Sequence, residues 1–146
     1  MTDLRIEQVD GETALQDWRH VHNTIIPTAV LSLDEVRESA RRNRLEVAYL
    51  GDLLVGCSTV RPPTGDSSTA TVIARVLPAH RRQGHGGAIY ARGLAAAREL
   101  GAEVIETVVL ASNPEGLRFA QAQGFTEVER YLLPGDSVPF VDLRLN

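Results

Sequence analysis

Hydrophobic and polar positions along the chain follow two different periods, and these periods predict the first part of the secondary structure. Residues 4–9 alternate apolar and polar side chains, as in a strand with one buried face. Apolar side chains then recur with helical period from residue 14 until Pro27, which predicts an amphipathic helix. Ser32 and Glu35 have the spacing of a capping box, so we expect a second helix to begin directly afterwards and to end near residue 43.

Runs rich in β-branched residues predict the middle of a sheet. Residues 45–50 and 53–60 are separated by Gly51-Asp52, a two-residue turn that favours a hairpin. Residues 69–77 are rich in Val, Ile and Thr, and this strand is expected to end before Pro78, because proline cannot donate to a strand ladder. An alanine-rich helix is expected over residues 88–100, followed by Gly101 as its C-terminal cap.

The remaining third of the chain predicts one more helix between strands. Residues 104–110 are apolar and β-branched enough for a strand, and Asn113 and Pro114 suit the cap and first position of a helix. Two last strands are expected around residues 126–133 and 138–145. With 146 residues and 43% hydrophobic content, the chain can bury a core but is too short for two ordinary domains.

A glycine-rich loop lies between the strand that ends before Pro78 and the alanine-rich helix. Its sequence is Arg81-Arg82-Gln83-Gly84-His85-Gly86-Gly87. Glycines let a ligand approach the backbone closely, and the N–H groups of a first helical turn, together with the helix dipole, favour an anion. The two arginines add positive charge. The loop is therefore predicted to hold phosphate groups.

Three known patterns can be compared with this loop. A P-loop would need Lys-Ser or Lys-Thr after a glycine, and a dinucleotide fingerprint would need a third glycine, and neither is present. The pattern R-x-x-G-x-G, after a strand that ends V-x-P, resembles the coenzyme A motif of the GNAT family of N-acetyltransferases, with Arg81, Gly84 and Gly86 in the matching positions. A glycine-rich turn that only caps a helix, with solvated arginines, is the alternative.

A second stretch supports the resemblance. Residues 113–125 (NPEGLRFAQAQGF) resemble the family's second element, in which an asparagine at the end of a strand opens a helix that ends in Gly-Phe. The resemblance covers nearly the whole chain. It implies an α/β fold of one GNAT domain over residues 1–146, with a central mixed, largely antiparallel sheet of six or seven strands flanked by about four helices.

The resemblance also implies the reaction and its co-substrate. The protein would transfer an acetyl group from acetyl-CoA directly to the primary amine of an unidentified acceptor, either a small molecule or a peptide. The pantetheine arm would lie between two splayed strands, the pyrophosphate would bind N–H groups of residues 82–87, and an N–H near Val76 would donate to the thioester oxygen. The coenzyme-binding residues implied in this way are Ala74, Arg75, Val76, Arg81, Arg82, Gln83, Gly84, His85, Gly86, Gly87, Asn113 and Phe119.

The residues that handle protons depart from the family pattern. Ala120 stands where many relatives have a tyrosine, and Val108 stands where many have a glutamate. Glu106, one pleat earlier on the same face, and Tyr131, on the next predicted strand, are the remaining candidates for catalytic base and acid. Because water can also carry these protons, we expect water to protonate the leaving thiolate. A coenzyme A-binding module with little or no transferase activity is the alternative function.

Charge and composition predict few other partners. A net charge of -4 gives no basic footprint for nucleic acid, and no apolar run approaches the roughly 20 residues that cross a membrane. The single Cys57 is compatible with a reducing cytoplasm, where we expect the protein. His20 and His22 would point to different helix faces, so no metal site is expected, and His22 is predicted to pack beside Trp18.

Two expectations concern surfaces. The acceptor is expected between the first two helices and the loop over residues 132–139. The last strand, residues 138–145, is expected to be an uncovered edge of the sheet, which is compatible with a homodimer.

Overall fold

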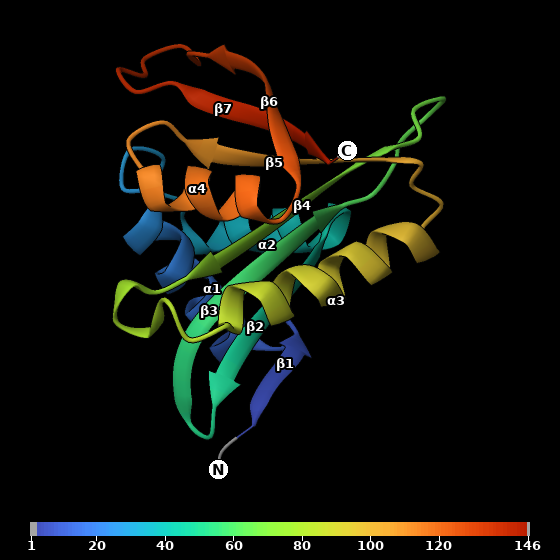
Figure 1. The fold of residues 1–146 in the computed structure, drawn as a ribbon. Helices are drawn as coiled ribbons and strands as arrows, with labels where there is room; N and C mark the ends of the chain where they lie inside the picture. Colours follow the sequence, from blue (N-terminus) through green and yellow to red (C-terminus); the bar gives the residue numbers. More distant parts are fainter. Residues whose placement is uncertain (1–2, 146) are drawn as a thin grey trace.

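The computed structural model describes residues 3–145, which form one sheet with helices on both faces (Figure 1). The order of elements agrees with the order predicted from sequence, apart from an added 3-10 turn at Pro78–His80. The helices and strands have these bounds: β1 Leu4–Gln8, α1 Glu12–Ile25, α2 Leu33–Arg42, β2 Arg44–Leu50, β3 Leu53–Arg61, β4 Thr69–Val76, α3 His85–Glu99, β5 Val104–Leu110, α4 Pro114–Ala122, β6 Phe125–Tyr131 and β7 Phe140–Leu145.

The seven strands lie in the order β1-β2-β3-β4-β5-β7-β6. Only β4 and β5 are parallel to each other, and every other neighbouring pair is antiparallel. The predicted fold class, a mixed and largely antiparallel sheet flanked by helices, is therefore confirmed. No helix among the described residues is both long and apolar enough to span a membrane.

The expectation that the last strand is an edge of the sheet is wrong. β7 lies between β5 and β6 and pairs with both, so the edge strands are β1 and β6. Burial gives the physical reason: Val141 and Leu143 of β7 are fully buried, whereas β6 is exposed from its second to its sixth residue. The apolar strand β7 therefore lies inside the sheet, and the charged strand β6 forms its edge.

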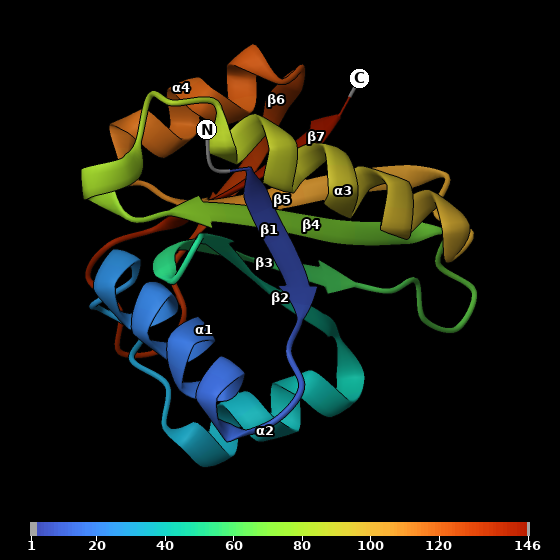
Figure 2. The same cartoon turned by 90° about the horizontal axis from the view of Figure 1, so that it is seen from below.

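The two pairs of helices cover opposite faces of the sheet (Figure 2). α3 and α4 bury a core that includes Val72, Tyr90 and Phe125. α1 and α2 pack on the other face, where Trp18 lies in a second core and donates from Nε1 to the Ser58 carbonyl oxygen at 3.0 Å. This hydrogen bond fixes α1 over β3, and the end of α1 then lies beside the end of β4.

Local sequence signals explain where the helices begin. The predicted capping box is present in α2, since the Ser32 hydroxyl accepts from the Glu35 N–H and the Glu35 carboxylate accepts from the Ser32 N–H. α3 begins at His85, three residues before the predicted start, because Gly86 and Gly87 adopt helical conformation despite their low helix propensity. Gly86 and Gly87 therefore belong to the first helical turn, and Gly84 is its N-cap.

A buried carboxylate joins α3 to the sheet, and it gives a stability prediction. Glu46 of β2 is 1% exposed, and Arg92 of α3 donates to both of its oxygens, at 2.8 and 3.0 Å. Replacing Arg92 with methionine keeps the packing stem but leaves Glu46 with Arg44 alone. We expect the free energy of unfolding to fall by about 2 kcal/mol, measured by urea denaturation, because a buried charge loses hydrogen bonds. Arg98→Met, at an exposed site on the same helix, is the matched control, and an equal loss in both variants would contradict this role of the pair.

Candidate functional site

The sheet opens between its two parallel strands. β4 and β5 pair only from Thr69 to Thr71, opposite Val104 to Glu106, and then separate. On the other side of β4, the Leu77 N–H donates to the Val55 carbonyl oxygen at 2.9 Å. Bonded and non-bonded pairs alternate along an antiparallel ladder, so the main chain of Arg75 faces β3, and the N–H groups of Ala74 and Val76 face the gap. The gap therefore offers unpaired main-chain donors at two positions of one strand.

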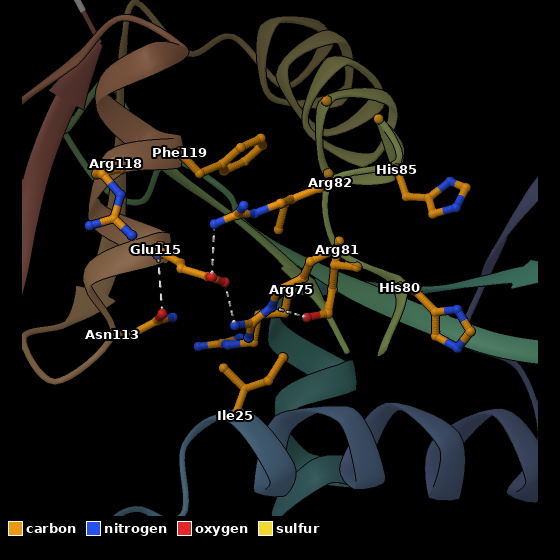
Figure 3. Close-up of a pocket in the computed structure, with 16 residues that line it drawn as sticks. Ile25, Arg75, His80, Arg81, Arg82, His85, Asn113, Glu115, Arg118 and Phe119 are labelled. Atoms are coloured by element: carbon orange, nitrogen blue, oxygen red, sulfur yellow. Dashed lines mark hydrogen bonds and ion pairs between the residues drawn. The ribbon is translucent and has the colours of Figure 1, made fainter. Parts of the chain in front are cut away.

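A cavity of about 340 Å³ begins at this gap and continues to the N-terminus of α3. Its walls come from the end of α1, the end of β4, the loop before α3 and the first turns of α4, as Figure 3 shows. All of the coenzyme-binding residues implied by the sequence line this cavity, except Gln83. Gln83 is exposed beside it, with its amide oxygen 3.3 Å from the His85 ring.

The N-terminus of α3 has the geometry of an anion site. Gly84 caps the helix in the left-handed conformation, with φ of 85°, which glycine adopts without strain. The first intrahelical bond runs from the Ala88 N–H to the Gly84 carbonyl, so the N–H groups of residues 85–87 have no acceptor within the helix. A Cβ on Gly86 would lie 2.9 Å from the Phe119 ring, so glycine is what lets α3 and α4 approach each other here.

The arginines of the loop are held by a carboxylate that sequence reasoning missed. Arg81 donates to the Val76 carbonyl oxygen at 3.0 Å and pairs with Glu115 of α4 at 3.1 Å, and Arg82 reaches the same carboxylate at 3.5 Å (Figure 3). The pairs cross the cavity and neutralise part of its positive charge. The side chain of Arg82 is nevertheless 83% exposed, so it can turn towards a phosphate group. Only the position of Glu115 in the first turn after Asn113 hints at this contact in the sequence.

Asn113 caps α4 as predicted, since its side-chain oxygen accepts from the Gly116 N–H at 3.1 Å. The amide nitrogen of the same side chain remains available to a ligand in the cavity, because the cap uses only the oxygen. A narrower cavity of about 40 Å³ extends the gap between β4 and β5 to the other face, and Val108, Ala120 and Arg75 line it. Val108 and Ala120, the two positions at which the sequence departs from the expected pattern, therefore both lie at the gap.

The strand register brings distant charged residues onto the α1 side of the sheet. Going across β3, β4, β5, β7 and β6, side chains on this face form three rows. The first row is Arg61, Thr71, Glu106, Arg144 and Thr126; the second is Thr59, Ile73, Val108, Asp142 and Glu129; the third is Cys57, Arg75, Leu110, Phe140 and Tyr131. The gap interrupts the second and third rows between β4 and β5, so the side chains of these two rows lie on either side of it.

The structure places the two candidate proton-handling residues away from the cavity. Glu106 pairs with Arg144 at 2.8 Å, so its carboxylate is engaged by the neighbouring strand. Tyr131 donates from its hydroxyl to Asp142 at 3.1 Å, and burial and the Asp142 charge raise the pKa of Tyr131 to about 12. Neither residue lines the two cavities at the gap. Their catalytic roles stay predictions.

Asp142 is a further carboxylate that the sequence did not indicate. It lies directly opposite Val108 in the β5–β7 ladder, so its side chain projects from the same face beside the position where relatives carry glutamate. Burial raises the pKa of Asp142, as do the charges of Glu106 and Glu129, while the Tyr131 hydrogen bond opposes the shift. Its signal in the sequence is a single acidic residue between two buried apolar residues of β7.

His22 and Cys57 have the packing roles predicted for them. The His22 ring stacks on Trp18 with centroids 5.3 Å apart, and Cys57 is buried in the same core. Within residues 3–145, no group of three or more histidine, cysteine, aspartate or glutamate side chains could hold a metal ion.

Comparison with known proteins agrees with this geometry. Residues 12–125 match the model of the Acetyltransferase (GNAT) family, and the chain therefore belongs to that family. No match was found among curated protein sequences.

Solved structures with the same fold include two that contain the coenzyme. The Bacillus subtilis acetyltransferase in complex with CoA is 22% identical, with 99% of each chain covered and a TM-score of 0.70. The Salmonella typhimurium protein yncA with its cofactor acetyl-CoA is 18% identical, with 97% of this chain and 92% of that chain covered and a TM-score of 0.71. The ribosomal-protein-S18-alanine N-acetyltransferase from Escherichia coli is 17% identical, with 98% and 93% covered and a TM-score of 0.76. At these identities the likeness shows a shared fold.

Proposed function

We propose that the protein is an acetyl-CoA-dependent N-acetyltransferase that acts on a primary amine. The observation that carries this proposal is one continuous cavity from the N–H groups at the start of α3 to the N–H groups of Ala74 and Val76 that face the gap. An anion cradle followed by a strand-like slot suits a ligand with a pyrophosphate and an extended amide-containing arm, and coenzyme A has both.

In the proposed reaction, the amine nitrogen attacks the thioester carbon. The carbon–sulfur bond breaks, the acetyl group stays on nitrogen, and coenzyme A leaves as a thiolate that takes up one proton. The Val76 N–H, which faces the gap, would donate to the oxygen that becomes negative in the transition state. Holding the amine and the thioester together lowers the activation free energy, by up to about 7 to 11 kcal/mol in favourable cases.

We propose that Asp142 accepts the proton of the attacking amine through a bridging water molecule. Its carboxylate projects beside Val108, which lines the gap, while Asp142 itself lines neither cavity, so a water molecule is needed to connect it to the amine. The raised pKa makes this carboxylate a stronger base than an ordinary aspartate. Ala120 is 1% exposed and carries no hydroxyl, so the thiolate takes its proton from water.

Glu115 has a proposed role in coenzyme binding. Its carboxylate pairs with Arg81 and Arg82 across the cavity, and a pyrophosphate would compete for the same guanidinium groups. The half-exposed Glu115 can turn to solvent at small cost, because exposed ion pairs contribute about 1 kcal/mol or less.

Release of free thiol from acetyl-CoA with a panel of primary amines tests the proposed function. Binding of acetyl-CoA is measured separately by calorimetry. Amine-dependent release of thiol supports the transferase, whereas tight binding with no turnover on any amine would favour the alternative, a coenzyme A-binding module. The absence of Tyr and Glu at Ala120 and Val108 is the observation that favours this alternative.

A further inference from the structure

Among the residues that the structure describes, no carboxylate balances the positive charge of Arg75. Its side chain projects to the α1 side of the sheet and lines both the main cavity and the narrow extension of the gap. Within residues 3–145, its only hydrogen-bond partner is the thiol of Cys57, its neighbour across the β3–β4 ladder. Burial raises the pKa of that thiol to about 12, so Cys57 is neutral and supplies no negative charge.

The other groups that face Arg75 are also neutral or positive. Arg61 approaches from β3, and its own side chain forms no ion pair among the described residues. Burial, Arg75 and Arg61 together lower the pKa of His22 to about 4, which keeps its ring uncharged at neutral pH. Tyr90 reaches Arg75 from the opposite face of the sheet, and burial raises its pKa, so it is neutral as well.

Three other arginines around the site form ion pairs with carboxylates. Arg81 and Arg82 share Glu115, and Arg144 pairs with Glu106. A charge removed from water is costly unless an opposite charge accompanies it. Arg118 also lines the main cavity and forms no ion pair within the described part of the chain, but it is exposed to water, as is Arg61, whereas Arg75 is partly buried. An anion supplied from outside would therefore lower the cost at Arg75.

Negative groups gather on the far side of the same surface. Asp142 and Glu129 lie across the gap in the second row, and Tyr131 hydrogen-bonds to Asp142. The charge of Arg61 lowers the pKa of both Asp142 and Tyr131, so its guanidinium lies near enough to act on them. Positive charge on β3 and β4 thus faces negative charge on β6 and β7, with the gap between them.

We propose that the acceptor is a small amine that also carries a carboxylate, such as a free amino acid, and that Arg75, assisted by Arg61, binds the carboxylate. A guanidinium recognises the planar carboxylate through two parallel hydrogen bonds, which also orients the molecule. The amine end then points towards Asp142 and the thioester carbon. This inference rests on the proposed function, and it narrows the acceptor to one chemical class.

The test compares amines that differ only in the carboxylate. L-leucine is paired with 3-methylbutan-1-amine and L-phenylalanine with 2-phenylethylamine, and thiol release from acetyl-CoA gives kcat/KM for each. We expect the amino acid to be favoured by about 100-fold, and Arg75→Gln to remove most of this ratio through KM, since one charged hydrogen-bonding partner accounts for that scale. Arg75→Lys should restore part of the ratio. Arg98→Gln, on the exposed side of α3, is the control and should leave the ratio as it is.

Three outcomes would overturn the inference. One is a wild-type preference for amines without a carboxylate, and another is an equal loss on both members of a pair in Arg75→Gln, which would mean that Arg75 acts on the thioester instead. The third uses no turnover. With coenzyme A bound, NMR titration of the His22 ring should show its pKa rising when L-leucine is added, because a bound carboxylate offsets Arg75 and Arg61. An unmoved His22 pKa would overturn the inference even if no amine is acetylated, whereas failure of the proposed function would appear as absent thiol release with every amine.

Discussion

Replacement of Gly87 with glutamate is expected to weaken coenzyme A binding by about 100-fold, or about 2.7 kcal/mol, while the protein stays folded. Gly87 lines the cavity in the first turn of α3, and a Cβ there would meet no atom within 4 Å. The new carboxylate would fill the space in front of the N–H groups and repel the pyrophosphate. A negative side chain in the first turn does not harm the helix itself, because it interacts favourably with the helix dipole.

Calorimetric titration with coenzyme A measures this effect. Ala95→Glu adds the same charge to an exposed site on the same helix, outside the cavity, and should leave the affinity unchanged. Gly87 serves better than Gly84 or Gly86 for this purpose. Gly84 has a positive φ, and a side chain on Gly86 would press on Phe119, so their variants would confuse strain with loss of binding. If a folded Gly87→Glu protein binds coenzyme A with unaltered affinity, the pyrophosphate does not bind at the start of α3.

Replacement of Asp142 with asparagine is expected to lower kcat by about 100-fold, the usual scale for a lost general base. Because the pKa of Asp142 is raised, the wild-type rate should fall as pH drops through that raised value, where the carboxylate takes up its own proton. Asparagine cannot titrate, so this limb of the profile should be missing from the variant. The measurement is kcat against pH with one amine for both proteins.

Two further variants separate catalysis from structure at this position. Glu103→Gln removes an exposed carboxylate elsewhere and serves as the control. Adding Val108→Glu to Asp142→Asn returns a carboxylate to the neighbouring strand on the same face, and some of the lost rate should come back. If Asp142→Asn keeps a normal kcat and still loses activity at low pH as the wild type does, Asp142 is not the base, and water alone accepts the proton of the amine.

The parts of the site that sequence predicts well are those built from neighbouring residues. The loop from Arg81 to Gly87 combines glycines, arginines and a helix start within one short stretch, so its residue pattern alone indicates an anion site. The cap at Asn113 is equally local, since its hydrogen bond joins residues three positions apart. Nothing in these elements depends on how the strands are ordered.

The parts that sequence does not predict depend on register between distant strands. Asp142 comes beside Val108 only because β7 inserts between β5 and β6, and the same insertion made the expected edge strand wrong. Glu115 meets Arg81 across 34 positions of sequence. Arg75 was predicted as a coenzyme-binding residue beside Ala74 and Val76, but its backbone faces β3 and its side chain is the group that reaches the cavity. Which of the two faces the cavity, main chain or side chain, follows only from the alternation of hydrogen-bonded and non-bonded residues once the pairing of the strand is known.

The closing strand of the sheet has a consequence for how the protein behaves at high concentration. β6 leaves one side of its main chain unpaired, which is a template on which strands of other copies could aggregate. Glu127, Glu129 and Arg130 stand exposed along it, and a bulge interrupts its register between Glu127 and Glu129. Charged side chains and a bulge both make an edge a poor partner for another strand. The chain should therefore resist strand-by-strand aggregation, and two copies that associate should do so through a different surface.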